Sequence, residues 1–319
     1  MPESNSPLPP GIAGTVATVG TFDGVHLGHQ HVLERLRTRG ARLGLPTLVV
    51  TFEPHPLEII RPEDAPGRLT VREEKLIALA GCGIDYVAEI AFTPAFRRLS
   101  AETFIRDVLL ARYRVRALLV GHDHGFGRGR EGDARLVQGI ARTVGFEVNV
   151  VDAVAVASGG PLSSTAIREA VAIGDLATAA RGLGHPYEVL GHVSAGAGRG
   201  RTLGFPTINL TLPSARKLLP PIGVYAVRAT CAEGSFGGMM NLGPRPTFGE
   251  QSTTLEVHLF ETAGSWYGRA VAVQFVAHLR ETMKFTGPEA LIEQLRTDAE
   301  TARRALTEVR SPDTLRGSG

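Results

Sequence analysis

Apolar segments alternate with amphipathic ones along the first half of the chain, and this alternation limits the possible folds more than any other feature. Helices are expected between the apolar segments, for example over 29–44 and 101–113. The segments with the length and composition of strands are 15–20, 46–52, 85–92, 117–121 and 146–151. Strands joined through helices of this length form βαβ units with right-handed crossovers. We therefore predict an α/β domain with a mostly parallel sheet.

The pattern changes near residue 185, where short strands separated by Gly and Pro begin. The expected strands are 187–193, 223–230, 236–243, 254–260 and 270–280. This spacing predicts a small antiparallel barrel or sandwich. A helix over 287–306 should follow. Pro288 is compatible with it, because the first turn of a helix does not use its backbone N–H groups in intrahelical hydrogen bonds. We place the boundary near residue 182, which gives domains 1–182 and 183–319.

Composition narrows the partners and the compartment. The 319 residues include 34 basic and 32 acidic side chains, and a net charge of +2 gives no electrostatic case for nucleic acid or an anionic membrane surface. No apolar run approaches the ~20 residues of a membrane helix, and the first residues lack the features of a signal peptide. Cys82 and Cys231 lie far apart without metal-ligand spacing. We expect two buried thiols in a reducing compartment and a cytoplasmic protein.

Three unusual segments come directly after predicted strands. They are GTFDGVHLGHQHVL (20–33), TFEPHP (51–56) and GHDHGFGRGREGD (121–133). Ligands of parallel sheets bind beyond the carboxyl ends of the strands. The coincidence therefore places a candidate ligand site at this edge of the sheet.

The first of these segments has the composition of an anion site. A glycine-rich turn from a strand into a helix points backbone N–H groups and the positive helix end at one place. His26 and His29 are three residues apart, so both can lie on one side of the first helical turn and donate to phosphate. Gly28 between them would let a nucleotide approach the backbone. Alternatively, Asp23 and Gly24 make a simple turn and the histidines are surface residues, and these residues alone leave both interpretations open.

The other segments of the first half are ambiguous by themselves. In SSTAIR (163–168) the hydroxyl groups and Arg168 can cap a helix, the commoner case, or bind phosphate. Phe52 and His55 beside two prolines can wall an aromatic pocket or form a stiff turn. The segment 121–133 can be a mobile loop or, through His122, Asp123 and His124, a metal site, although neighbours on an extended chain point in opposite directions.

The second half carries a different polar pattern. In GAGRGRTLGFPTINL (196–210), Thr207 and Asn209 share one strand face and offer hard oxygen ligands suited to Mg²⁺. The preceding glycines could drape backbone over a nucleotide, although this is not a Walker loop. In TLEVHLF (254–260), Glu256 and His258 share the face opposite the apolar residues. A solvated strand face would show the same patterns, so the spacing alone does not decide.

The order of these motifs resembles that of the bacterial bifunctional riboflavin kinase/FMN adenylyltransferases, also called FAD synthetases. GTFDGVHLGHQ, TFEPHP, the G-x-D-x-x-F-G of 121–127 and SSTAIR are followed by PTIN, NLGPRPTFGE, LEVHLF, WYG and LRETMKF, across essentially the whole chain. The resemblance implies a Rossmann-like nucleotidyltransferase domain of the HxGH superfamily, then a small antiparallel β-barrel riboflavin kinase domain with a C-terminal helix. It also implies phosphorylation of riboflavin to FMN and adenylylation of FMN to FAD, both with ATP and Mg²⁺.

The same resemblance implies roles for individual residues. His26 and His29 would steady the ATP phosphates, Thr207 and Asn209 would bind Mg²⁺, and Glu256 would act as the base toward the ribityl hydroxyl. Asp123 would lie near ATP and flavin, and Ser163, Thr165 and Arg168 would hold the triphosphate, while His55 and Phe126 would line the isoalloxazine. The further residues expected to contact nucleotide or flavin are Gly20, Phe22, Asp23, Gly24, Gly28, Phe52, Ser164, Gly198, Arg201, Gly204, Asn241 and Arg280.

Three positions depart from the family pattern. His124 stands where Phe is usual, which bears on stacking in the flavin pocket. Ala166 stands where Arg is usual, which leaves more of the triphosphate to Arg168. Ile208 replaces a commoner Ala and faces away from the metal pair. The alternatives are a riboflavin kinase with a decayed first domain, a flavin sensor or carrier without turnover, and a metal-dependent hydrolase built on 122–124. A homo-oligomer is compatible with all of them.

Overall fold

The computed structural model describes residues 8–121, 134–152, 162–195, 199–244, 253–261, 264 and 266–308. By its internal contacts the chain divides into two compact units, Met1–Ser164 and Thr165–Gly319. Each unit is described by itself below. The domain boundary near residue 182 stays a prediction, because the division by contacts falls earlier, at the start of a helix.

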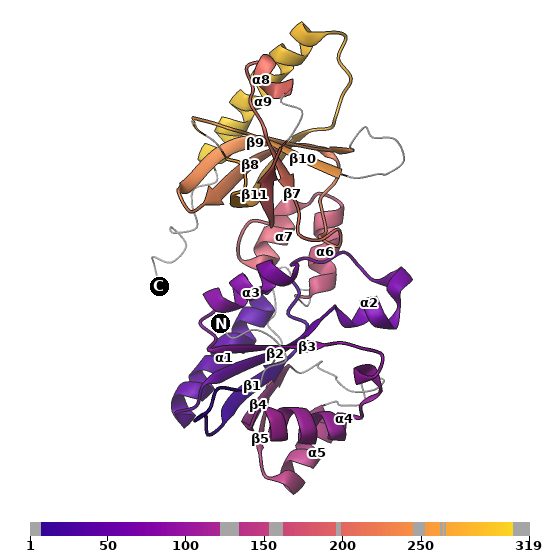
Figure 1. The fold of residues 1–319 in the computed structure, drawn as a ribbon, viewed down its shortest axis with the longest axis vertical. Coiled ribbons are helices and arrows are strands. Elements are labelled where there is room, and N and C mark those ends of the chain that lie inside the picture. Colours follow the sequence, from indigo (N-terminus) through magenta and orange to yellow (C-terminus); the bar gives the residue numbers. More distant parts are fainter. Residues whose placement is uncertain are drawn as a thin grey trace. The chain divides into compact units, whose positions relative to one another are not determined.

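Within the described residues, the first unit contains a five-stranded parallel sheet (Figure 1). The strand order is β3-β2-β1-β4-β5, and every pair of neighbours is parallel. The predicted parallel sheet is confirmed, and each predicted strand agrees with the observed one within two residues. The strands are β1 (Thr15–Val19), β2 (Thr47–Glu53), β3 (Tyr86–Ala91), β4 (Val115–Gly121) and β5 (Glu147–Val151).

Helices cover both faces of this sheet. Successive residues of a strand point to opposite faces, and Val16 and Ala17 of β1 accordingly belong to different apolar clusters. The Val16 cluster includes side chains of α1 (Leu27–Leu43) and α3 (Arg72–Gly81), whereas the Ala17 cluster includes α4 (Ala101–Thr103), its π-helical continuation η3 (Phe104–Arg112) and α5 (Ala134–Val144). The short helices α2 (Pro56–Ile60), η1 (Pro62–Asp64) and η2 (Phe96–Arg98) lie in the connections.

The strand order places the loop after β1 at the switch point of the sheet. From β1 the chain first adds β2 and β3 on one side, and later adds β4 and β5 on the other. In open parallel sheets the ligand crevice lies at the carboxyl ends of the two strands where this direction reverses. The loop 20–26 leaves β1 at that point, whereas the segment that follows β4, residues 122–133, is outside the described residues.

In the second unit, six described strands form a closed antiparallel barrel in the order β10-β7-β6-β11-β8-β9. This resolves the choice between barrel and sandwich. Ahead of the barrel come α6 (Ser164–Ala172), which begins at the end of the first unit, and α7 (Leu176–Leu183). The barrel elements are β6 (Glu188–Ser194), the short α8 (Arg199–Thr202), β7 (Ile208–Thr211), β8 (Gly223–Cys231), β9 (Gly234–Pro244), β10 (Thr253–Leu259) and β11 (Ala270–Arg280).

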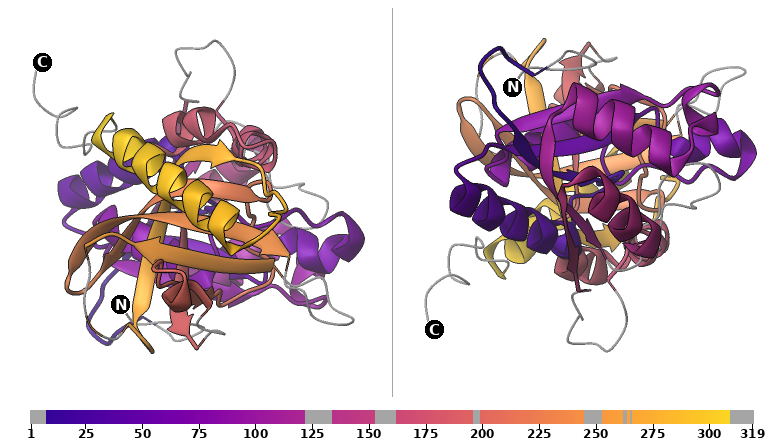
Figure 2. Two further views of the ribbon diagram at one scale, coloured as in Figure 1. Left: turned by 90° about the horizontal axis from the view of Figure 1, so that it is seen from above. Right: turned by 90° about the horizontal axis from the view of Figure 1, so that it is seen from below.

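The C-terminal helix α9 (Pro288–Glu308) lies across the barrel strands, as the left view of Figure 2 shows. It packs against β8, β9 and β11. Ala299 and Ala302 bury against Ala226, Met239 and Phe260, and their small side chains let the helix approach the sheet closely. The predicted closing helix is therefore confirmed.

Alternation along β10 leaves a polar row outside the barrel. Leu255, Val257 and Leu259 are buried, whereas Glu256 and His258 between them are half-buried on the opposite face. This is the arrangement predicted from TLEVHLF.

Two expectations need correction or extension. Cys82 and Cys231 are free but half-buried, so the expectation of buried thiols was wrong. Helix α3 was not predicted at all.

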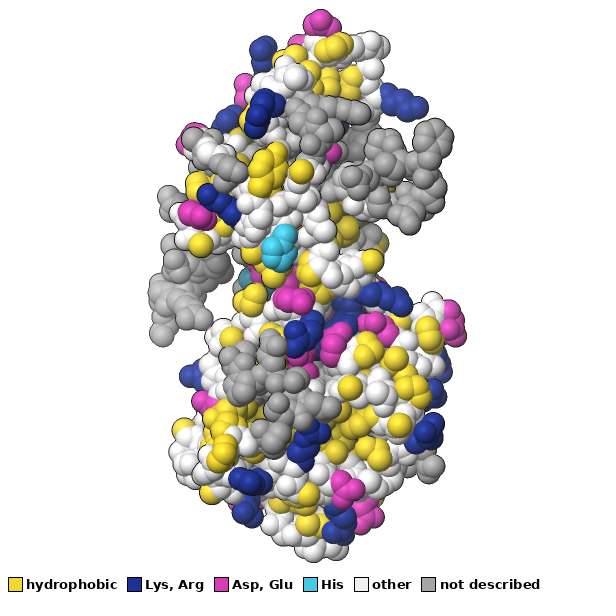
Figure 3. Space-filling model, viewed as in Figure 1, with side chains coloured by type: hydrophobic (Ala, Val, Ile, Leu, Met, Phe, Trp, Pro, Cys, Tyr) yellow, Lys and Arg dark blue, Asp and Glu magenta, His cyan; other side chains and the backbone are white. Residues whose placement is uncertain are grey.

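In the described part of the chain no helix combines the length and apolarity needed to cross a bilayer. On the face drawn in Figure 3, basic and acidic side chains are interspersed among the described residues.

Candidate active sites

The backbone of the loop 20–26 is held in an uncommon shape. Phe22 (φ 50°), Gly24 (φ 83°) and Val25 (φ 38°) all lie in the left-handed region. A non-glycine residue there costs on the order of 1–3 kcal/mol and persists only where its surroundings enforce it. A Cβ at Gly20 would lie 3.0 Å from the Phe22 ring, so this glycine is part of the same shape. Strain of this kind gathers at functional sites.

The two histidines lie together at the start of α1. His26 is the N-cap residue, and its Nδ1 accepts a hydrogen bond from the His29 N–H at 3.4 Å. The imidazole rings stack with their centroids 3.7 Å apart and an interplanar angle of 20°. Both rings therefore lie at the positive end of the helix dipole, where an anion is stabilised.

His29 is neutral near pH 7. Burial, and secondly the neighbouring His26, hold the pKa of His29 well below its usual value of 6.5. Its Nδ1 is buried and hydrogen-bonds to no described residue, and its ring lies 5.0 Å from that of Phe22. A neutral imidazole keeps one N–H, so His29 can donate one hydrogen bond without carrying charge.

Gly28 lies close against the stacked rings. A Cβ at this position would lie 3.1 Å from Cε1 and 3.2 Å from Nδ1 of His26, closer than side chains normally pack. A larger residue would therefore require the His26 ring to shift by a few tenths of an ångström. This role is distinct from the predicted close approach of a nucleotide, which stays a prediction.

Asp23 joins the loop 20–26 to neighbouring segments through hydrogen bonds. It is 2% exposed, and its carboxylate accepts a hydrogen bond from the Thr70 N–H at 2.9 Å. The Ser164 hydroxyl donates to the Asp23 carbonyl at 2.9 Å, which brings the first residue of α6 to this loop. A ligand contact for Asp23, Gly24 or Ser164 stays a prediction. Ser163 is half-buried just before α6, and Thr165 and Arg168 lie within α6 in the second unit.

The predicted flavin-side residues have visible structural partners. Phe52 packs into the apolar core, with ring centroids 5.6 Å from Phe92 and 5.8 Å from Phe96. His55 is the N-cap of α2 and accepts from the Leu57 N–H at 3.2 Å. Their contact with a flavin stays a prediction. The predicted residues outside the described part of the chain are Asp123, Phe126 and Gly198, together with the departure at His124.

On the barrel, Glu256 stands between two asparagines. It pairs with Asn209 of β7 on one side and with Asn241 of β9 on the other. Residues directly opposite in antiparallel strands share a face, with Cβ atoms roughly 4.5–5.5 Å apart. The register therefore aligns a carboxylate and two amides in one row on the outer face.

Thr207 belongs to the same surface. It precedes β7 directly, two residues from Asn209, so the two oxygens can face the same side. Within the described chain, the side chains of Thr207, Asn209 and Glu256 make no hydrogen bond. Their oxygen atoms are thus available to a ligand.

The glycine loop before β7 packs onto Thr207. A Cβ at Gly200 would collide with the Phe205 carbonyl oxygen and come within 3.3 Å of the Thr207 Oγ1. Gly204 has φ +81°, which a side chain would strain, and Arg201 is exposed. Contacts of Gly204 and Arg201 with a nucleotide stay predictions.

Arg280 is already engaged with the C-terminal helix. Its Nε donates to Oδ1 of Asp298 at 2.9 Å and its Nη2 to Oδ2 at 2.7 Å. Asp298 is 3% exposed, so this is a nearly buried bidentate ion pair that joins β11 to α9. The predicted ligand contact of Arg280 stays a prediction beside this structural role.

Comparison with known proteins identifies the two units. A family model described as FAD synthetase matches residues 9–166, and one described as riboflavin kinase matches residues 183–306. The bifunctional riboflavin kinase/FMN adenylyltransferase of Escherichia coli (strain K12) is 42% identical over 91% of this chain and 92% of its own. The chain belongs to this family. A member from Pseudomonas fluorescens is 41% identical over 93% of this chain and 94% of its own.

The riboflavin kinase/FMN adenylyltransferase family assignment agrees with the geometry. The stacked histidines fall in the FAD synthetase segment, and the Asn209–Glu256–Asn241 row falls in the riboflavin kinase segment. A crystal structure titled as a macrolide-efflux protein from Streptococcus pneumoniae has a TM-score of 0.83 and 29% identity, covering 93% of this chain and 95% of its own. That likeness extends over both units.

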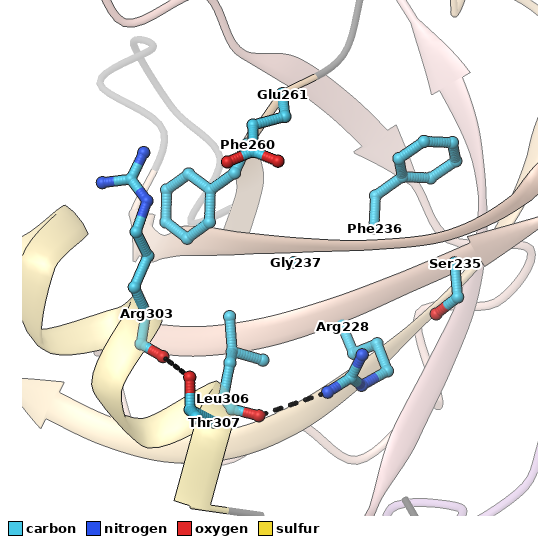
Figure 4. A pocket seen from close by; sticks show the side chains of 9 residues that line it. All are labelled: Arg228, Ser235, Phe236, Gly237, Phe260, Glu261, Arg303, Leu306 and Thr307. Carbon is cyan, nitrogen blue, oxygen red and sulfur yellow. Dashed lines mark hydrogen bonds between the residues drawn. The ribbon is translucent and has the colours of Figure 1, made fainter. Parts of the chain in front are cut away.

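A cavity of about 540 Å³ on the barrel unit is separate from the predicted kinase residues (Figure 4). Its arginines have structural partners: Arg228 donates to the Leu306 carbonyl at 3.4 Å, and Arg303 lies 4.2 Å from the centre of the Phe260 ring. These contacts anchor the end of α9. The lining residues are Arg228, Ser235, Phe236, Gly237, Phe260, Glu261, Arg303, Leu306 and Thr307.

Sequence reasoning missed the residues that support the histidine loop from the segment before α3. Arg68, Thr70 and Lys75 contact the ends of β1 and β2 through hydrogen bonds and ion pairs. A signal was present, because 72–79 has acidic residues in its first turn and apolar residues at helical spacing.

Proposed function

We propose that this chain makes FAD from riboflavin in two ATP-dependent steps, with FMN formed beside Glu256 and FAD formed beside His26 and His29. The observation that carries the proposal is the match of both domain models to the segments that hold these residues. Members with both activities in their names align with more than nine-tenths of the chain.

In the first step, the 5′-hydroxyl of the ribityl chain attacks the γ-phosphorus of ATP. The new P–O bond gives FMN, the bond to ADP breaks, and Glu256 accepts the hydroxyl proton. A base acts only within about 2.6–3.2 Å of that proton. The strand register places Glu256 between two asparagines on the outer face of the barrel, where its half-buried carboxylate can reach a bound ligand.

In the second step, an FMN phosphate oxygen attacks the α-phosphorus of ATP, and pyrophosphate leaves. No covalent enzyme intermediate is needed, because positioning and charge stabilisation carry most phosphoryl transfers. The N–H groups at the start of α1 and the two imidazoles offer preorganised donors to the developing charge.

Thr207 and Asn209 would hold Mg²⁺ for the kinase step. A hydroxyl and an amide oxygen are hard, neutral ligands that fit an ion which keeps waters and phosphate as its other ligands, and both side chains are without hydrogen bonds in the described chain. When bound, the ion would neutralise phosphate charge. No cluster of three or more His, Cys, Asp or Glu suited to a metal occurs among the described residues.

The same proposal covers setting and partners. We expect a cytoplasmic enzyme whose partners are ATP, riboflavin and FMN, without a nucleic-acid partner, and we leave a homo-oligomer open. The rival with a decayed first domain rests on Ala166, which is exposed in α6, and on His124, which lies outside the described residues. The intact histidine pair weighs against that rival.

Two reciprocal variants test the assignment. Glu256→Gln should abolish FMN formation from riboflavin yet still convert supplied FMN to FAD. His29→Ala should lower FAD formation about a hundredfold, because a preorganised donor is lost, while FMN formation continues. Flavins are separated by chromatography after incubation with ATP and Mg²⁺.

Matched controls are Glu300→Gln, exposed on α9, and His31→Ala, two residues beyond the stacked pair. Both should retain both activities. FMN as the sole product of the wild type would support the decayed-domain rival, and no product at all would support a sensor or carrier.

A further inference from the structure

The segment 68–75 (RLTVREEK) contacts the two strand ends that bear the predicted adenylylation residues. It runs from a partly buried stretch after η1 into the first turn of α3. Neither its polar residues nor its helix were expected to matter for the site. Its contacts reach the loop 20–26 after β1 and the residues 51–53 at the end of β2.

Thr70 fastens the histidine loop. Its backbone N–H donates to Oδ1 of Asp23 at 2.9 Å, and its hydroxyl accepts from the Gly24 N–H at 2.9 Å. The same hydroxyl lies 3.4 Å from the Asp23 carboxylate, to which it can donate. One threonine therefore satisfies both the carboxylate and the backbone of a turn whose dihedral angles are strained.

Lys75 and Arg68 fasten the end of β2. Lys75 is fully buried, and its Nζ donates to the Phe52 carbonyl at 3.2 Å and to the Thr51 hydroxyl at 3.4 Å. Arg68 is 5% exposed and donates to the Glu53 carboxylate at 3.0 Å. These bonds fix the backbone just before the predicted flavin-side residue His55.

A further bond closes the connection between the two strand ends. The Thr51 hydroxyl, which accepts from Lys75, donates to the Thr21 carbonyl at 3.2 Å. Thr51 and Lys75 are both fully buried, so the bonds that connect Lys75 through Thr51 to Thr21 are shielded from water. A buried polar group without a partner costs more free energy than a single hydrogen bond contributes. Breaking only one bond of this connected set is therefore unfavourable.

We propose that the segment 68–75 is a clasp that holds the loop 20–26 and the end of β2 at a fixed separation, with Thr70 as a positioning residue for adenylylation. The proposal rests on the function proposed above for His26 and His29. Because those rings follow directly from a strained turn, releasing Thr70 would let the turn relax and move the donors away from the α-phosphate. A shift of about 1 Å in such donors is enough to slow a reaction by one or two orders of magnitude.

The test replaces Thr70 by Val in the full chain. Thr70→Val keeps the shape and the backbone N–H but removes the acceptor for Gly24, and it should lower kcat/KM for FAD formation from supplied FMN about tenfold or more. Thr70→Ser should restore most of the rate. FMN formation from riboflavin should keep its kcat and KM, and the loss of FAD formation should fall mainly on kcat rather than on KM for FMN.

Thr38→Val is the matched control, because it removes an exposed hydroxyl that bonds to the Glu34 carbonyl within α1. It should leave both activities unchanged. Thr51→Val breaks the clasp at a second place and should also reduce FAD formation. It replaces Thr70→Val in the test if that variant is too unstable to measure. Circular dichroism and thermal unfolding identify folded variants.

Unchanged FAD formation in folded Thr70→Val, with an active wild type, would overturn the clasp alone. Failure of Thr70→Ser to restore the rate would do the same. A wild type that forms FMN but no FAD would instead contradict the proposed function, and the clasp's role in adenylylation with it.

Discussion

His29 shows how packing sets the chemistry available to one side chain. Burial and the adjacent His26 lower its pKa, so in the role proposed above it would meet a phosphate as a neutral donor rather than as a cation. Attraction of the anion would then fall to the N-terminus of α1.

The lowered pKa of His29 predicts a pH dependence of stability. In the unfolded chain His29 takes up a proton near its ordinary pKa of 6.5, whereas in the folded chain it stays neutral to lower pH. Its contribution is therefore fully present above about pH 6.5 and is lost as the pH falls from there toward the folded-state pKa. Between pH 7.5 and 5.5 the free energy of unfolding of the wild type should fall by about 1 kcal/mol more than that of His29→Gln.

Urea unfolding at the two pH values measures this difference. His31→Gln, two residues further along the same helix, serves as the comparison. Equal pH slopes for the wild type and His29→Gln would show that His29 titrates normally in the folded protein.

At the residue scale, the sequence predicted the strand face of a side chain better than its contacts. The alternation in TLEVHLF placed Glu256 on an outer face, but its position between Asn209 and Asn241 depends on strand register, which local patterns do not specify. Asp23 and Arg280 were predicted as ligand contacts, and the structure reveals tertiary partners for both, Thr70 and Asp298. Those partners are 47 and 18 residues away in the chain.

The elements differ in how far local pattern determines them. The almost continuously buried run of β2 and the alternation of β10 are clear local patterns, and both strands were predicted almost to their ends. Helix α3 was missed because it buries Glu74 and Lys75, charged residues that normally mark a solvent face. The burial is compensated because Glu74 accepts a hydrogen bond from the Val71 N–H, and Lys75 donates to the Phe52 carbonyl and lies 3.6 Å from the Glu53 carboxylate.

The ion pair between Arg280 and Asp298 joins helix α9 to β11 beside the apolar contacts of the same two elements. Asp298→Ala would leave the Arg280 guanidinium without its nearly buried partner, and we expect the free energy of unfolding to fall by about 2–3 kcal/mol, given that Arg280 is partly exposed. Urea unfolding followed by the fluorescence of Trp266, in the same unit, measures it. Glu102→Ala, which breaks the exposed pair with Arg106, should cost about 0.5 kcal/mol or less. Equal losses in both variants would contradict this role.

At the scale of the whole molecule, the chain joins an open parallel sheet to a closed barrel, and each unit presents its own phosphate chemistry. The strand order places the histidine loop at the switch point of the sheet, and the barrel register builds the row around Glu256. Near residue 185 the sequence changes from strands alternating with helices to short strands separated by Gly and Pro, and this change was enough to predict two modules. It also placed α6 and most of α7 in the first module, within domain 1–182, and that boundary stays a prediction.

Isotopic labelling of ATP tests the central claim most directly, because the two proposed steps transfer different phosphorus atoms. The wild type is incubated with riboflavin, Mg²⁺ and ATP labelled with ³²P at either the γ or the α position, and the flavins are separated and counted. We expect γ-label in both FMN and FAD, and α-label in FAD alone. Flavins that acquire γ-label but never α-label would contradict adenylylation by this chain, and flavins that acquire neither would contradict FMN formation, on which the second step depends.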